Sequence, residues 1–175
     1  MRYAQLLVLA VFLAGCSMLG AGTLGSFQQW SFSISEKRLD KEIANLYKNN
    51  PSYIIPDKWK ELDTWNKSGY GFLKGKIFYF KDIPEQMYYI SYHEIEANSY
   101  GNDSDSTVST IAVRAVNSGD ELIINKEDTI WISNRWDTRD DFDERVANNI
   151  DKRFYKEIIS RLESEIGQKA RKYNE

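Results

Sequence analysis

The side chains that most often carry catalytic or metal-binding chemistry are scarce in this sequence. It holds one histidine, His93, and one cysteine, Cys16, among 175 residues. The segment His93-Glu94-Ile95-Glu96 lacks the second histidine of the zinc-protease motif H-E-x-x-H, and zinc sites in general need several such ligands. A serine triad could use only His93, and the G-x-S-x-G motif is absent. The sequence therefore predicts no metal site and no cofactor.

Acidic residues form three groupings that could do other chemistry. Asn102–Ser106 places oxygen ligands at alternate positions, like the start of a calcium loop, but the glycine and the bidentate acid that complete such a loop are missing. Glu94/Glu96 and Asp140/Asp141 could each supply the carboxylate pair used in glycoside hydrolysis. Nothing in the sequence places either pair across a cleft, and the second pair suits the start of a helix. We therefore expect a non-catalytic protein.

The first sixteen residues indicate where the protein works. Arg2 gives a basic start, residues 6–13 form an apolar run, and Leu13-Ala14-Gly15-Cys16 follows. The run is too short to span a bilayer but has the length of a signal-peptide core. This arrangement resembles the signal peptide and lipobox of bacterial lipoproteins. The alternative is a buried N-terminal helix or strand, which is disfavoured by the glycines that follow, at positions 15, 20, 22 and 25.

The lipoprotein resemblance implies a membrane anchor. Residues 1–15 would be removed, and lipid would be attached to Cys16, which then holds the chain on the bilayer. In a Gram-negative source, Ser17 after the cysteine implies the outer membrane, facing the periplasm. Residues 16–26, which are small and uncharged, would form a flexible tether between the lipid and a single domain at residues 27–175.

Composition bounds what the anchored part can do. Removal of residues 1–15 leaves 160 residues, enough to bury a core without crosslinks. The mature chain would have no disulfide, because the lipid occupies Cys16. Its net charge would be about −4, since Arg2 is lost from a chain of net charge −3. This acidity argues against nucleic-acid binding and against electrostatic adhesion to anionic lipid.

The first part of the predicted domain is helical. Ser33 with Glu36 fits a capping box, and apolar residues then recur at helical spacing until Asn49-Asn50-Pro51 ends the helix. Asp57 can cap a second, short helix. The apolar residues on the face of the first helix are Leu39, Ile43, Leu46 and Tyr47.

The middle of the chain predicts an antiparallel sheet. Aromatic and β-branched residues alternate with polar ones between turn signals. We expect strands at residues 71–81, 87–97, 107–116, 121–125 and 129–133. The last two complete the sheet, either as separate strands or as one strand with a bulge near Lys126. Alternation places Tyr88, Ile90 and Tyr92 on one face. On the next strand, alternation places Ile111, Val113 and Ala115 on one shared face.

A long C-terminal helix is the clearest element. Thr138 with Asp141 resembles a capping box, and apolar residues then follow every four positions. A helix turns every ~3.6 residues, so each step drifts by about 40° and six steps by about 240°. The second half of the helix must therefore meet the N-terminal helix, a curved sheet edge or a partner protein. The apolar positions are Phe142, Val146, Ile150, Phe154, Ile158, Leu162 and Ile166.

These observations predict an α+β fold: an antiparallel four- to five-stranded meander, an N-terminal helical part and a long C-terminal helix packed on one face. The other sheet face would be solvated or used for binding. We expect a lipid-anchored accessory factor that binds other envelope proteins. The alternatives are an inhibitor or immunity protein against a toxin or hydrolase, and a small-ligand carrier or enzyme. Residues expected to contact a partner are Leu162, Ile166, Tyr88, Tyr92 and Tyr100.

Overall fold

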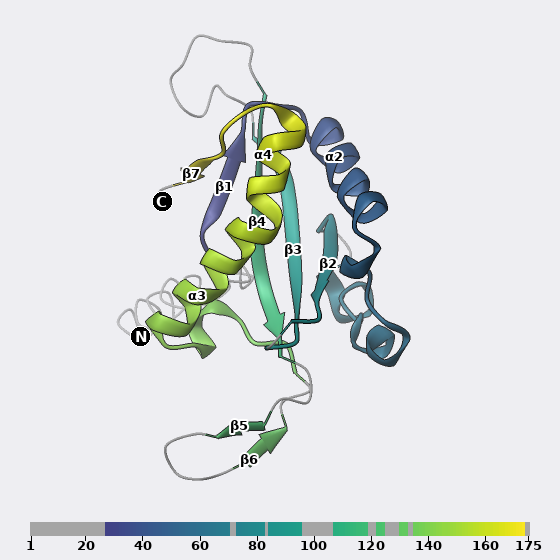
Figure 1. Cartoon of the computed structure of the whole chain (residues 1–175), viewed down its shortest axis with the longest axis vertical. Coiled ribbons are helices and arrows are strands. Elements are labelled where there is room, and N and C mark those ends of the chain that lie inside the picture. Colours follow the sequence, from purple (N-terminus) through teal and green to yellow (C-terminus); the bar gives the residue numbers. More distant parts are fainter. Residues whose placement is uncertain are drawn as a thin grey trace, which may run out of the picture.

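The fold is a five-stranded antiparallel sheet with the two long helices on one face, and it has the α+β class that the sequence predicts. The C-terminal helix runs diagonally across the sheet, and the N-terminal helix lies beside it (Figure 1). The strand order is β2 (Gly75–Phe80), β3 (Gln86–Ile95), β4 (Val108–Asn117), β1 (Gln29–Phe32) and β7 (Arg171–Tyr173). The computed structural model describes residues 27–70, 73–82, 84–95, 107–118, 122–124, 130–132 and 135–173.

Two of the five strands are not those that the sequence predicts. β5 (Leu122–Ile124) and β6 (Ile130–Ile132) pair with each other in a separate two-stranded sheet, drawn below the main sheet in Figure 1. The expectation that they complete the main sheet is therefore wrong. The place beside β4 is taken by β1, whose Trp30 and Phe32 are buried in the main core. β7, from the other end of the domain, then pairs with β1.

The pairing of β3 with β4 contains one β-bulge. Tyr89 pairs with Ala115 but Ile90 pairs with Val113, so Arg114 is an extra residue on β4. The bulge turns Ala115 to the opposite face from Val113, and the expectation that these two share a face is wrong. On β3 the predicted alternation is confirmed, since Tyr88, Ile90 and Tyr92 all lie in the main core.

The N-terminal helix α2 (Glu36–Asn49) begins two residues later than its predicted cap. The hydroxyl of Ser35, not Ser33, accepts a hydrogen bond from the Arg38 N–H at 3.4 Å. The helix ends before Pro51, as predicted. The short helix expected after Asp57 is a 3-10 helix, η3 (Asp57–Leu62). The predicted apolar face is confirmed by the burial of Leu39, Ile43 and Leu46.

The C-terminal helix also starts later than expected. The capping box of Thr138 and Asp141 is present, but it closes a 3-10 turn, η6 (Arg139–Asp141). α3 (Glu144–Phe154) is capped by Asp143, whose carboxylate accepts the Val146 N–H at 2.8 Å. A π-helical turn, η7 (Tyr155–Ile159), joins α3 to α4 (Ser160–Ile166).

The π turn helps to keep a four-residue apolar spacing on one side of the helix. Its hydrogen bonds run from residue i to i+5, so it is wider than an α-helical turn and offsets part of the predicted drift. The rest is taken up by α2, which contacts α4. Of the three surroundings left open by the sequence, the N-terminal helix is the one observed. The main core encloses Ile150, Phe154, Ile158, Leu162 and Ile166.

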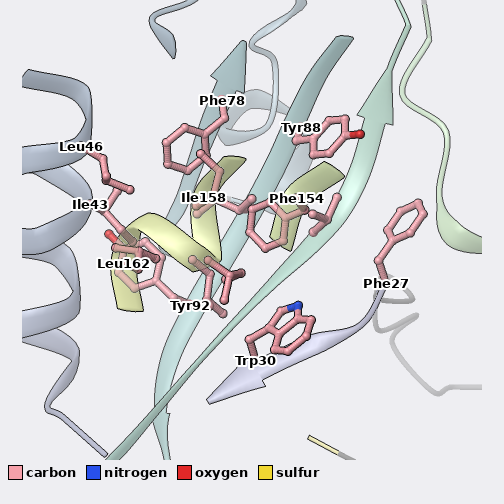
Figure 2. Close-up of a cluster of buried hydrophobic side chains, with 14 of the residues drawn as sticks. Phe27, Trp30, Ile43, Leu46, Phe78, Tyr88, Tyr92, Phe154, Ile158 and Leu162 are labelled. Atoms are coloured by element: carbon pink, nitrogen blue, oxygen red, sulfur yellow. The ribbon is translucent and has the colours of Figure 1, made fainter. Parts of the chain in front are cut away.

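The apolar residues form two clusters, one on each face of the sheet. In the main core, side chains from α2, the sheet and the C-terminal helix meet (Figure 2), with Trp30 on the β1 side and Ile43 and Leu46 on the α2 side. The other face of the sheet, the far face, is partly covered by η3 and the residues that follow it. This differs from the expectation that this face is solvated or used for binding. The second cluster contains Trp59, Trp65, Ile77, Met87, Tyr89 and Ala115.

Candidate functional site

Four of the residues predicted to contact a partner lie inside the fold. Leu162 is 0% exposed and Ile166 8%, because α4 packs its apolar side against α2 and the sheet. Tyr88 is 0% exposed and Tyr92 3%, because their face of β3 is the one that the helices cover. The prediction of a partner surface at these four residues is wrong. The predictions for Tyr100 and for lipidation of Cys16 fall outside the described residues.

The polar residues considered for catalysis have local structural roles. The carboxylate of Glu94 accepts the Glu36 N–H at 2.8 Å, at the start of α2. Asp141 belongs to the Thr138 capping box. Partial burial and the charge of Arg114 lower the pKa of His93. Within the part of the chain that the structure describes, no group of three or more His, Cys, Asp or Glu side chains could hold a metal ion.

The described residues form several hollows, and one of them lies at the open edge of β2. We call it the edge groove; its volume is about 630 Å³, within the range of ligand sites. It lies where the chain leaving α2 passes the edge strand of the sheet. Its lining residues are Tyr47, Ile54, Ile55, Lys60, Asp63 and Ile77.

Tyr47 shapes one wall of the edge groove. Its ring stacks on Phe78, with centroids 4.7 Å apart and planes 3° apart. Its hydroxyl donates a hydrogen bond to the carbonyl of Ile77 at 2.7 Å. Burial raises the pKa of Tyr47, so the hydroxyl keeps its proton and remains a donor. Because this carbonyl belongs to an edge strand, the hydrogen bond blunts the edge against added strands. The groove is therefore suited to side-chain contacts.

The partly exposed carboxylate of Glu85 holds the segment that carries Lys60, one of the residues lining the edge groove. Glu85 accepts hydrogen bonds from the Tyr79 hydroxyl at 2.5 Å and the Trp59 indole at 3.1 Å, and Lys58 lies 2.9 Å away. The hydrogen bonds from Tyr79 and Lys58 lower the pKa of Glu85, while burial raises the pKa of Tyr79 to about 12. Since Trp59 lies in η3, this cluster holds η3, and with it Lys60, against the β2–β3 pair.

The exposed side chain of Ile54 favours binding of a partner at the edge groove. It is 55% exposed, the one large apolar side chain that is exposed among the described residues. Its neighbours Ile55 and Ile77 line the same hollow. An apolar groove with an exposed aliphatic rim can accept an apolar anchor side chain, which is the usual centre of a protein interface.

Another of these hollows lies between the C-terminal helix and the β1–β7 edge of the sheet. We call it the Trp30 groove; its volume is about 610 Å³. Tyr155, the first residue of the π turn, packs on Trp30 with ring centroids 4.8 Å apart. π turns are rare and frequent at functional sites. The lining residues are Gln28, Trp30, Asn148, Asp151, Lys152, Tyr155, Glu163, Lys169, Ala170 and Lys172.

The pKa values of the two carboxylates in the Trp30 groove are shifted in opposite directions. Burial raises the pKa of Glu163, but hydrogen bonds from Lys169 at 2.7 Å and the Ala170 N–H at 3.1 Å outweigh it, so the net pKa lies below its ordinary value. Burial raises the pKa of Asp151, and the single N–H of Gln28 at 2.8 Å does not outweigh it.

Sequence reasoning missed both grooves because each joins distant segments. The edge groove combines α2, the segment after it and β2, and the Trp30 groove combines residue 28 with residues 148–172. No short motif marks such a combination. Trp30 and the lysines of residues 169–172 were visible in the sequence, but only the β1–β7 pairing brings them together.

No family model, no curated protein and no solved structure matches this chain. Among the described residues, none of the helices has the length and apolarity needed to cross a membrane.

Proposed function

We propose that this chain is a lipid-anchored, non-catalytic accessory protein of the bacterial envelope that binds another envelope protein through the edge groove. The anchor is Cys16, by resemblance to the lipobox. The observation that carries the binding role is the apolar edge groove with Ile54 exposed on its rim. Its partner contributes an apolar side chain, since the Tyr47 hydrogen bond to Ile77 disfavours strand addition.

The partner surface is tested by crosslinking in native membranes followed by mass spectrometry. Wild type is compared with Ile54→Asp, which places a charge on the rim, and with Asn149→Asp, which adds the same charge to an exposed position of α3. We expect one abundant envelope partner with wild type and Asn149→Asp, and its loss with Ile54→Asp. Equal capture by Ile54→Asp, or no specific partner with wild type, would contradict the proposal.

Anchoring has its own test. Cys16→Ser should leave an unprocessed precursor without lipid, which intact-mass measurement detects. If Cys16→Ser fractionates with membranes as the wild type does and the wild type carries no lipid mass, the anchoring part of the proposal is wrong. This result would not affect the edge groove.

The inhibitor alternative depends on a protruding acidic loop. The sequence offers Asp103 and Asp105 for that role, and they lie outside the described residues. The small-ligand alternative is favoured by a specific observation, the Trp30 groove, whose volume is that of a ligand site.

A further inference from the structure

We propose that the Trp30 groove binds the anionic headgroup of a phospholipid in the membrane that holds the anchor. This inference rests on the anchoring of Cys16 proposed above. Among the residues that line the groove, the Trp30 indole N–H has no hydrogen-bond partner, Lys152 and Lys172 form no close ion pair, and both carboxylates already accept hydrogen bonds. A phosphate oxyanion supplies the missing acceptor.

The first unsatisfied group is the indole N–H of Trp30. Trp30 is only 7% exposed, and its Nε1 has no hydrogen-bond partner. Buried donors are almost always paired, and each exception calls for an explanation. Trp65 has a second unpaired indole N–H, but it lies within the aromatic cluster of the far face, stacked on Tyr89 at 3.9 Å. Trp30 differs because it lines an open groove.

Lysines supply the positive charge. The ammonium group of Lys172 lies 5.6 Å from the centre of the Trp30 ring. Among the described residues, neither Lys172 nor Lys152 forms an ion pair with a carboxylate, whereas Lys169 pairs with Glu163. Lysine ammonium groups are strong donors to phosphate oxygens. The two unpaired lysines and the indole N–H therefore form a set of donors around one hollow.

The carboxylates of the groove do not compete for a cation. Glu163 accepts hydrogen bonds from Lys169, from the Ala170 N–H and from the Tyr155 hydroxyl at 3.3 Å. Asp151 accepts the Gln28 N–H through Oδ1. Lys172 also interacts with the charge of Asp151, but the three lysines that line the groove outnumber its two carboxylates, so the groove favours a negative ligand over a positive one.

Chain length places the groove within reach of the bilayer. Gln28, which lines the groove, follows Cys16 by twelve residues, and twelve extended residues span at most about 40 Å. The ring of Tyr155 and the methyl group of Ala170 give the groove an apolar wall beside its donors, which suits an amphipathic molecule. The net charge of about −4 that the processed chain would carry, since Arg2 is lost from a chain of net charge −3, opposes broad adhesion to anionic lipid, so the attraction must come from a local site.

The indole N–H resonances test the proposal. The full chain, isotope-labelled and held in neutral detergent, is titrated with short-chain phosphatidylglycerol, short-chain phosphatidylcholine and glycerol 3-phosphate. The Trp30 signal is assigned by Trp30→Phe or, if that variant does not fold, by its contacts with Tyr155. We expect phosphatidylglycerol to shift the Trp30 N–H strongly and the Trp65 N–H not at all, with phosphatidylcholine much weaker.

The affinity for phosphatidylglycerol is tested with a variant that removes one positive charge from the groove. Lys172→Gln should weaken phosphatidylglycerol binding by about tenfold or more, the scale expected for one charged hydrogen bond. Lys156→Gln removes the same charge from an exposed position that does not line the groove and should leave binding unchanged. Equal weakening by both variants would overturn the proposal.

The remaining outcomes are equally decisive. No shift of the Trp30 N–H overturns the binding site, and a shift with glycerol 3-phosphate but not with the lipid overturns the membrane source. The mass of Cys16 in the same sample separates the two proposals: lipid on Cys16 without a shift removes the groove proposal alone. A Cys16 without lipid overturns both the anchoring and the lipid source, even if the shift occurs.

Discussion

The ring of Tyr89 lies against the backbone of Gly75, at a distance that leaves no room for a side chain. A Cβ atom at position 75 would overlap the ring. Tyr89 cannot move easily, because its other neighbour is Trp65, stacked at 3.9 Å with planes 6° apart. This contact locks the far-face cluster onto the first residue of β2.

Gly75→Ala should therefore destabilise the protein. We expect the free energy of unfolding to fall by about 1–3 kcal/mol, the usual cost of overpacking. Urea denaturation measures it, and Lys76→Ala, at the next and half-exposed position, should change it by less than about 0.5 kcal/mol. Wild-type stability for Gly75→Ala would show that the Tyr89 ring has another place to go.

Leu162 should behave as a core residue and Ile54 as a surface residue. Leu162→Ala leaves a cavity between α4 and its neighbours and should lower the free energy of unfolding by about 2–5 kcal/mol. Ile54→Ala, at a 55% exposed position, should change it by less than about 0.5 kcal/mol. Denaturant unfolding of the pair checks this. A small loss at Leu162 would reopen the helix end as a partner surface.

The two carboxylates of the Trp30 groove should act on stability with opposite signs. Glu163 has a folded-state pKa below its ordinary 4.5, so its contribution is present above that pH and is lost as pH falls through the lowered pKa. Asp151 has a folded-state pKa above its ordinary 3.8, so its ionisation costs stability that is recovered as pH falls below the raised pKa.

Paired variants separate these contributions. Glu163→Gln should be less stable than wild type at about pH 7, with the difference shrinking on acidification to about pH 3. Asp151→Asn keeps an acceptor for the Gln28 N–H but removes the buried charge, so it should be more stable at about pH 7. Urea unfolding across this range measures both. If both variants changed the free energy of unfolding at about pH 7 in the same direction, the assigned pKa shifts of the two carboxylates would be contradicted.

Local patterns explain how much of the fold was predictable. Alternation along β3 and the apolar face of α2 were correct because each depends on residues two to four positions apart. The cap of α2 was misplaced because Ser33 and Ser35 both precede Glu36, and only the position where the chain turns decides between them. The π turn could not be read from spacing alone, since a four-residue repeat also fits a helix that changes its partner.

Pairing between distant segments explains what was missed. β1 and β7 are only four and three residues long, too short to give a periodic signal, and they become strands because β4 offers them an edge. The bulge at Arg114 shifts Ala115 to the other face without any glycine to mark it. The Trp30 groove depends on the β1–β7 pairing, and the edge groove depends on the packing of residues 54–63 beside β2, so no short motif marks either of them.

The position of β1 also determines when the fold can be completed. β1 lies between β4 and β7, and its two partners come from residues 109–111 and 171–173. A growing chain therefore cannot close this sheet until residues 171–173 are available, and such non-local pairing slows folding. A chain truncated before Arg171 would leave β1 as an unpaired edge, exposed to association with other chains.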